Sequence, residues 1–167
     1  MNIAQILTPE RVGFDIEATS KKRALELLSA LLAEHQQNLT TCQVFDSLLA
    51  RERLSSTGLG RGVGLPHGRL KDLDRSLCAF VRLHEGIDFD SNDGQPVDLL
   101  CALLVPEQST DEHLQLLATL AEMFRDQELC RRLRAASSRE DLYRILVHWH
   151  PSDRSTPEPD PGHRAAS

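Results

Sequence analysis

The chain has 167 residues, and its 19 lysines and arginines against 25 aspartates and glutamates give a formal net charge of −6. This length suits one domain, and the 40% share of hydrophobic residues is enough to bury a core. The negative charge disfavours general binding to nucleic-acid backbones, and no run of about 18 apolar residues could cross a membrane. The first residues lack a basic start followed by an apolar stretch, so we expect no secretion signal and a cytoplasmic protein.

The first third of the chain predicts one strand and two helices. Residues 12–16 alternate between apolar and small or polar types, which is typical of a strand. Two amphipathic helices follow, and the second ends near residues 51–53. Each helix begins after a hydroxyl side chain that can accept hydrogen bonds from exposed backbone amides; the candidates are Thr19 or Ser20 for the first helix and Thr40 or Thr41 for the second.

The later part of the chain predicts two longer strands and three helices. Residues 77–83 predict a strand, with Gly86 in the turn that follows. Residues 97–105 form a nearly continuous apolar run that ends at Pro106, as in a central strand buried on both faces. Helices are expected from Asp111, around residues 129–133, and after Ser138, which with Asp141 resembles a capping box.

Three or four strands interleaved with about five helices indicate an α/β or α+β domain. We assign this domain to residues 1–150. Residues 151–167 contain four of the eight prolines and no apolar periodicity, so we expect a disordered tail there. The cysteines have no CxxC spacing, and His148 and His150 have no nearby partner of ligand type, so we expect buried thiols, no metal site and no cofactor.

The segment between the second helix and the next long strand carries most of the functional signal. Five of the nine glycines fall within residues 58–68. Pro66 fixes the backbone directly before His67, and Gly68 is expected to leave the far side of the imidazole open. Positive charge and hydroxyl groups surround this histidine in the sequence; they come from Arg51, Arg53, Arg61 and Arg69, and from Ser55, Ser56 and Thr57.

An imidazole among guanidinium, amide and hydroxyl groups suits phosphoryl transfer to histidine. The attacking ring must be neutral, and nearby arginines favour the neutral form. Donors around it can stabilise the charge that spreads over the phosphoryl oxygens. The glycine spacing fits neither a dinucleotide-binding loop nor a P-loop. Spacing alone is equally consistent with a structural histidine in a glycine-rich turn.

His113 is a second candidate residue. It lies early in the helix that follows the apolar strand, where α/β proteins place functional residues. Its ring could turn back toward the strand end, or it could lie half-exposed on the helix surface.

The residues together resemble the enzyme IIA domains of the fructose–mannitol class of the bacterial phosphoenolpyruvate-dependent phosphotransferase system, and most closely their stand-alone nitrogen-regulatory type. The resemblance covers about residues 2–148. Around the histidine, the family signature has an acidic or amide residue, then an apolar–small pair, then an apolar and proline-containing end. Here these positions hold Glu52, Leu59-Gly60 and Val63-Gly64-Leu65-Pro66-His67-Gly68.

The resemblance implies a mixed β-sheet flanked by helices and a role for each site residue. His67 would be the phosphorylated nucleophile, His113 and Arg51 would stabilise the phosphoryl group, and Ser56, Thr57 and Gly68 would line the same pocket. The ring nitrogen that reacts stays open. One departure is Gly64, where the family usually has alanine, and we expect the loop to be slightly looser for it.

The resemblance also implies partners and a function. A histidine phosphocarrier protein would supply the phosphoryl group, and the protein would act as a phosphoryl carrier rather than a conventional small-molecule enzyme. It would signal through phosphorylation-dependent binding to potassium-transport regulators or sensor kinases. Two alternatives stay open: a fructose- or mannitol-specific IIA that passes the group to a transporter IIB domain, and a regulator that binds partners whether or not it is phosphorylated.

Overall fold

A computed structural model of the chain describes residues 2–108 and 110–150. The expected disordered tail, residues 151–167, lies outside the described residues. None of the helices in the described part has the length and apolar character needed to span a bilayer.

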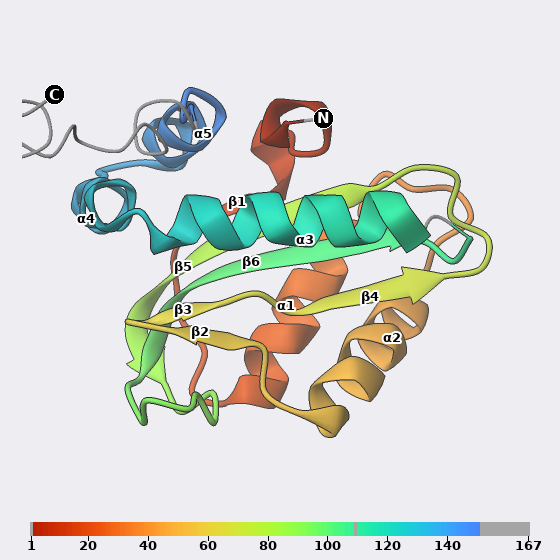
Figure 1. Cartoon of the computed structure of the whole chain (residues 1–167), viewed down its shortest axis with the longest axis horizontal. Coiled ribbons are helices and arrows are strands. Elements are labelled where there is room, and N and C mark those ends of the chain that lie inside the picture. Colours follow the sequence, from red (N-terminus) through yellow and green to blue (C-terminus); the bar gives the residue numbers. More distant parts are fainter. Residues whose placement is uncertain (1, 109, 151–167) are drawn as a thin grey trace, which may run out of the picture.

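The centre of the molecule is a six-stranded mixed β-sheet (Figure 1). Its strands follow the order β1-β5-β6-β3-β2, and β4 also pairs with β6. The long strands β5 and β6 are antiparallel, whereas β1 is parallel to β5, and β3 and β4 are parallel to β6. The bounds are β1 Val12–Ile16, β2 Gly58–Gly60, β3 Val63–Gly64, β4 His67–Leu70, β5 Leu77–Ile87 and β6 Val97–Pro106.

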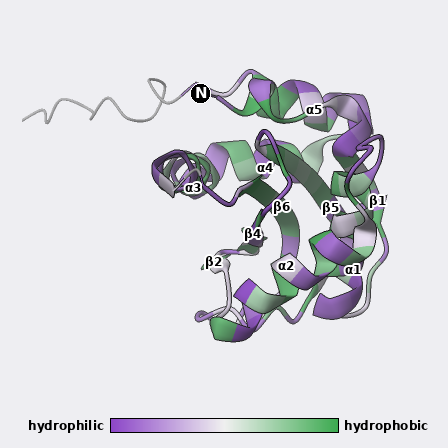
Figure 2. Cartoon of the chain, turned by 90° about the vertical axis from the view of Figure 1, so that its right-hand side faces the viewer, coloured by the Kyte–Doolittle hydropathy of each residue, from purple (hydrophilic) through white to green (hydrophobic). Residues whose placement is uncertain are grey.

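Helices cover both faces of the sheet. In Figure 1, α1 and α2 lie on one face, and α3, α4 and α5 lie on the other. Figure 2 shows hydrophobic residues concentrated in the sheet between these layers. The bounds are α1 Lys21–Ala33, α2 Thr41–Leu54, α3 Thr110–Arg125, α4 Gln127–Ala135 and α5 Arg139–Val147, with two 3-10 turns at Ile3–Gln5 and Pro9–Arg11.

The apolar run of β6 is a central strand buried on both faces, as the sequence predicts. Its residues alternate between two hydrophobic clusters: Leu99, Cys101, Leu103 and Val105 face α3, α4 and α5, while Leu100, Ala102 and Leu104 face α1 and α2. Strand geometry produces this alternation, because successive side chains point to opposite faces. The expected mixed sheet flanked by helices is therefore confirmed.

Several details of the sequence prediction are corrected. The sheet has six strands instead of three or four, because the glycine-rich segment forms three short strands rather than a loop. Gly86 lies inside β5 and not in a turn, and a Cβ there would lie 2.9 Å from Cβ of Pro96. Cys42 is exposed, although the other three cysteines are buried as expected.

The helix starts agree closely with the capping argument. Ser20 and Thr40, from the two candidate pairs, accept hydrogen bonds from the backbone of the first turns of α1 and α2. Ser138 caps α5 and accepts from Asp141 N–H, but the Asp141 carboxylate accepts from Ser137 N–H instead of closing the expected capping box.

Candidate functional site

His67 is the first residue of β4, and backbone hydrogen bonds fix it from two sides. It pairs with Leu103 of β6, whose N–H donates to the Pro66 carbonyl at 3.0 Å. Its own Nδ1 lies 2.9 Å from the carbonyl oxygen of Leu65. Because a carbonyl only accepts, Nδ1 must carry the proton in this contact. The neutral ring therefore keeps its lone pair on Nε2.

His113 lies beside His67, but it belongs to helix α3 and not to the sheet. It lies in the first turn of α3, and its ring centroid is 5.5 Å from that of His67, with the rings 62° apart. Its Nδ1 is buried and has no hydrogen-bond partner among the described residues. The two rings line one open hollow of about 320 Å³, together with Ser47, Ala50, Arg51, Leu54, Gly68 and Arg69.

Both histidines have lowered pKa values. Burial is the main cause for His67, and the Arg51 charge lowers its pKa further, while the Leu65 hydrogen bond and Glu52 act in the opposite direction. Burial also lowers the pKa of His113, with the charges of His67 and Arg69 adding to it. The lowered pKa values favour the neutral form of both rings, the state in which an imidazole nitrogen can act as a nucleophile.

Arg51 is the arginine that α2 places on the wall of the hollow. It lies in the last turn of the helix, and its Nη1 donates to the Ser55 carbonyl at 2.9 Å. Of the other arginines that the sequence grouped around the histidine, Arg69 also lines the hollow. Arg53 does not, and Arg61 lies at the β2–β3 turn, where Arg134 donates to its carbonyl at 2.9 Å.

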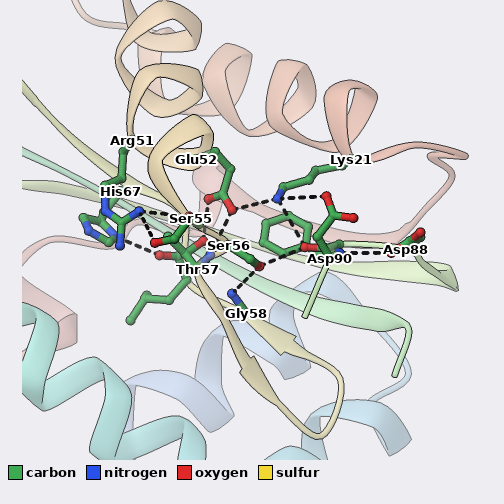
Figure 3. A network of polar contacts seen from close by, with 12 residues as sticks. Lys21, Arg51, Glu52, Ser55, Ser56, Thr57, Gly58, His67, Asp88 and Asp90 are labelled. Atoms are coloured by element: carbon green, nitrogen blue, oxygen red, sulfur yellow. Dashed lines mark hydrogen bonds and ion pairs between the residues drawn. The ribbon is translucent and has the colours of Figure 1, made fainter. Parts of the chain in front are cut away.

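The hydroxyls of Ser56 and Thr57 are used within the protein and are not among the residues that line the hollow. Ser56 Oγ donates to the Phe89 carbonyl at 2.9 Å. Thr57 Oγ1 donates to the Glu52 carboxylate at 2.5 Å, and Thr57 N–H donates to it at 2.9 Å. Figure 3 shows these contacts to the right of Arg51 and His67. These two residues therefore order the segment that enters β2.

Gly68 lines the hollow beside His67, but the space next to its own Cα is filled by α2. A Cβ at this position would clash with Ser47 Oγ and lie 3.2 Å from the Ser47 carbonyl carbon. Glycine is required here because α2 packs directly against β4. This close approach brings Arg51 of α2 to the imidazole.

Gly64 also differs from expectation, because there is no free space where the family usually has a methyl group. A Cβ there would lie 2.7 Å from Leu100 Cδ2 and 3.1 Å from Phe89 Cε2. The side chains of Leu100 and Phe89 occupy this space, so the segment is tightly packed and not loosened.

Glu52 is the main residue to which sequence reasoning gave no role. It is 7% exposed and accepts from Thr57 and from Lys21, whose Nζ lies 2.9 Å from Oε2. Its position offered a signal, since Val44, Leu48 and Glu52 follow one another at four-residue intervals on the buried face of α2. A carboxylate that continues an apolar stripe indicates a buried partner.

Comparison with known proteins agrees with this architecture. The family model of the phosphoenolpyruvate-dependent sugar phosphotransferase system, EIIA 2, matches residues 5–149. The nitrogen regulatory protein of Klebsiella oxytoca is 45% identical over 148 residues, which cover 88% of this chain and 91% of that protein.

Solved structures with similar folds include two of this kind of protein. The nitrogen regulatory protein IIA-Ntr of Neisseria meningitidis superposes with a TM-score of 0.81 at 42% identity, covering 86% of this chain and 98% of that one. The IIA mannitol protein of Escherichia coli gives a TM-score of 0.70 at 22% identity, covering 83% and 97%, and it shares the fold.

Proposed function

Because the chain belongs to the EIIA 2 family of the phosphoenolpyruvate-dependent sugar phosphotransferase system, and within it to the nitrogen-regulatory type, we propose that it carries a phosphoryl group on His67 and regulates other proteins through that group. The observation that carries this proposal is the arrangement at the hollow. A neutral imidazole presents Nε2 beside a second imidazole and two arginines.

The transfer is a displacement at phosphorus. The Nε2 lone pair of His67 forms a bond to the phosphorus of a phosphohistidine on a histidine phosphocarrier protein, while the donor's phosphorus–nitrogen bond breaks. The donor ring, protonated on its other nitrogen, leaves as neutral imidazole. His67 keeps its Nδ1 proton and becomes the positively charged ring, which the Leu65 carbonyl stabilises by accepting that N–H.

The charges around the hollow suit the group in transit. Arg51 and Arg69 supply guanidinium groups, and a guanidinium can donate two parallel hydrogen bonds to phosphoryl oxygens. His113, neutral before transfer, can take up a proton beside the new negative charge and donate to it. Ser56 and Thr57 contribute indirectly by ordering the segment before β2, and Gly68 by admitting α2.

The rim of the hollow offers a docking surface for the phosphocarrier. Leu54 and Leu114 are 80% and 60% exposed. Leu54 lines the hollow, and Leu114 follows His113 in α3. Exposed leucines around a polar centre are typical of a protein interaction site. After transfer, a doubly negative group beside these two leucines would change which regulators can dock. We propose potassium-transport regulators or sensor kinases as that class of partner.

The proposal places this activity in residues 1–150 and in the cytoplasm. Its test uses the purified full chain with a nitrogen-type phosphocarrier, its enzyme I and phosphoenolpyruvate, followed by peptide mapping of the label. Label on His67 is the expected result, and label on another residue would refute the assignment. A parallel reaction with a fructose or mannitol IIB domain separates the two family members: rapid onward transfer would favour the sugar-specific alternative.

A further inference from the structure

The hydrogen bond that fixes the His67 tautomer depends on a carbonyl that is itself held in place. Leu65 N–H donates to the Thr57 carbonyl at 3.0 Å, and the Leu65 carbonyl accepts from His67 Nδ1 at 2.9 Å. Pro66, between them, has a restricted backbone. The position of the carbonyl beside the imidazole is therefore set by Thr57, on the neighbouring segment.

Thr57 is in turn held by a buried carboxylate. Both its N–H and its hydroxyl donate to Glu52, at 2.9 and 2.5 Å. Lys21 completes this set, since its Nζ lies 2.9 Å from Glu52 Oε2. We refer to Lys21, Glu52 and Thr57 as the Glu52 network. In Figure 3, Glu52 lies between Lys21 and the side of the site that holds Arg51 and His67.

The members of the Glu52 network contact one another in series, with Glu52 between Lys21 and Thr57. A buried carboxylate without partners would be costly, and three donors, one of them the Lys21 cation, satisfy this one. Both oxygens of the carboxylate accept from these donors, so it orders the segment that enters β2. Lys21 comes from α1, so the network joins a helix outside the hollow to the imidazole.

On these contacts, and resting on the proposed function, we propose that Lys21 and Glu52 are positioning residues for His67. They hold the ring, through the backbone of Thr57 and Leu65, in the tautomer that has its proton on Nδ1. The lone pair then stays on Nε2, on the side that faces the hollow. In the opposite tautomer the Nδ1 lone pair would face the Leu65 carbonyl, and two acceptors would repel one another.

The first test measures the tautomer directly, without any phosphoryl donor. Two-bond ¹H–¹⁵N correlation spectra of the ¹⁵N-labelled full chain, at a pH where His67 is neutral, distinguish a proton on Nδ1 from one on Nε2. Wild type should show the Nδ1-protonated tautomer. Glu52→Gln and Lys21→Met should each add a second population with the proton on Nε2, and phosphoryl uptake should slow by about tenfold because the nucleophile is less well oriented.

Matched variants separate positioning from general damage. Asp90→Asn removes the other carboxylate near Lys21, at 3.6 Å, and should leave the tautomer unchanged, as Asn tolerates the positive φ of 58° at this position. Lys22→Met changes the exposed neighbouring lysine and should also have no effect. Thr57→Val removes the hydroxyl and should act like Glu52→Gln, whereas Thr57→Ser keeps it and should behave as wild type.

The outcomes distinguish this inference from the proposed function. If all folded variants keep the wild-type tautomer, the positioning role is refuted, even where uptake slows. If Glu52→Gln does not fold, Lys21→Met and the Thr57 pair decide the question by the same spectra. If the tautomer shifts as expected but wild type takes up no phosphoryl group, the proposed function is wrong while the positioning of the ring stands.

Discussion

The rings of His67 and His113 meet edge to face, with their centroids 5.5 Å apart. One ring begins β4 and the other lies in the first turn of α3, so the sheet edge and the helix must both fold to form the pair. The charge of His67 contributes to lowering the pKa of His113. A change in the charge of His67 should therefore shift the pKa of His113.

Phosphorylation of His67 should raise the pKa of His113. A nearby negative group favours the protonated imidazole, so the sign of the neighbour's effect changes when the phosphoryl group is added. NMR titration of His113 in the unmodified and phosphorylated proteins measures this shift. His84, which pairs with Asp15 outside the hollow, serves as the internal control and should titrate identically in both. An unchanged pKa of His113 would remove this residue from the phosphoryl site.

Replacement of Arg51 by alanine should slow phosphoryl uptake at least tenfold, about the loss of one charge-stabilising donor. Arg53→Ala is the matched control, because Arg53 is exposed on the same helix and does not line the hollow. Rapid-quench measurement with saturating phosphocarrier compares the two variants. Equal rates for both would show that Arg51 does not contact the group in transit.

The pKa of His67 should lie below the ordinary histidine value of 6.5 and should rise in Arg51→Ala. Burial lowers the pKa of the ring, and the Arg51 charge lowers it further, so removal of that charge favours protonation. On acidification, Arg51→Ala should therefore lose the neutral form of His67 at a higher pH than wild type does. NMR titration of His67 gives this value without interference from the donor. A pKa that falls on removal of Arg51 would contradict the electrostatic argument.

Gly68→Ala should destabilise the fold by about 1–3 kcal/mol, because the new methyl group must displace α2. Ser47 Oγ is the first atom it would meet. Urea denaturation compares wild type, Gly68→Ala, Ser47→Ala and the double variant. The double variant should recover part of the loss, since the clashing hydroxyl is absent. If the two free-energy losses simply add, the clash with the Ser47 hydroxyl is not the cause.

The long elements could be predicted from the sequence because periodicity and capping act locally. The alternating segment at 12–16 and the apolar run at 97–105 become β1 and β6, and Ser20 and Thr40 open their helices. The three short strands between α2 and β5 could not be predicted in this way. Their glycines carry no side chains to reveal an alternation, and pairing determines their conformation: β3 and β4 pair with β6, and β2 pairs with β3.

The sequence predicts which residues form the site better than it predicts their contacts. The position between glycines and next to a proline pointed to His67. No local sequence feature indicated that Arg61 lies at the β2–β3 turn or that Ser47 packs against Gly68. Those relations come from the packing of α2 and α4 on the sheet. Glu52 shows the same limit: its spacing with Val44 and Leu48 indicates burial, while its partners, Lys21 and Thr57, lie on either side of it in the chain.

Intact mass measurement decides whether His67 carries the phosphoryl group. The full chain is incubated with phosphoenolpyruvate, enzyme I and the phosphocarrier, and is then compared with His67→Ala treated in the same way. Wild type should gain the mass of one phosphoryl group, lost on brief acid treatment, and His67→Ala should gain none. An acid-labile gain in His67→Ala, or no gain in wild type, would refute the assignment of the phosphoryl group to His67.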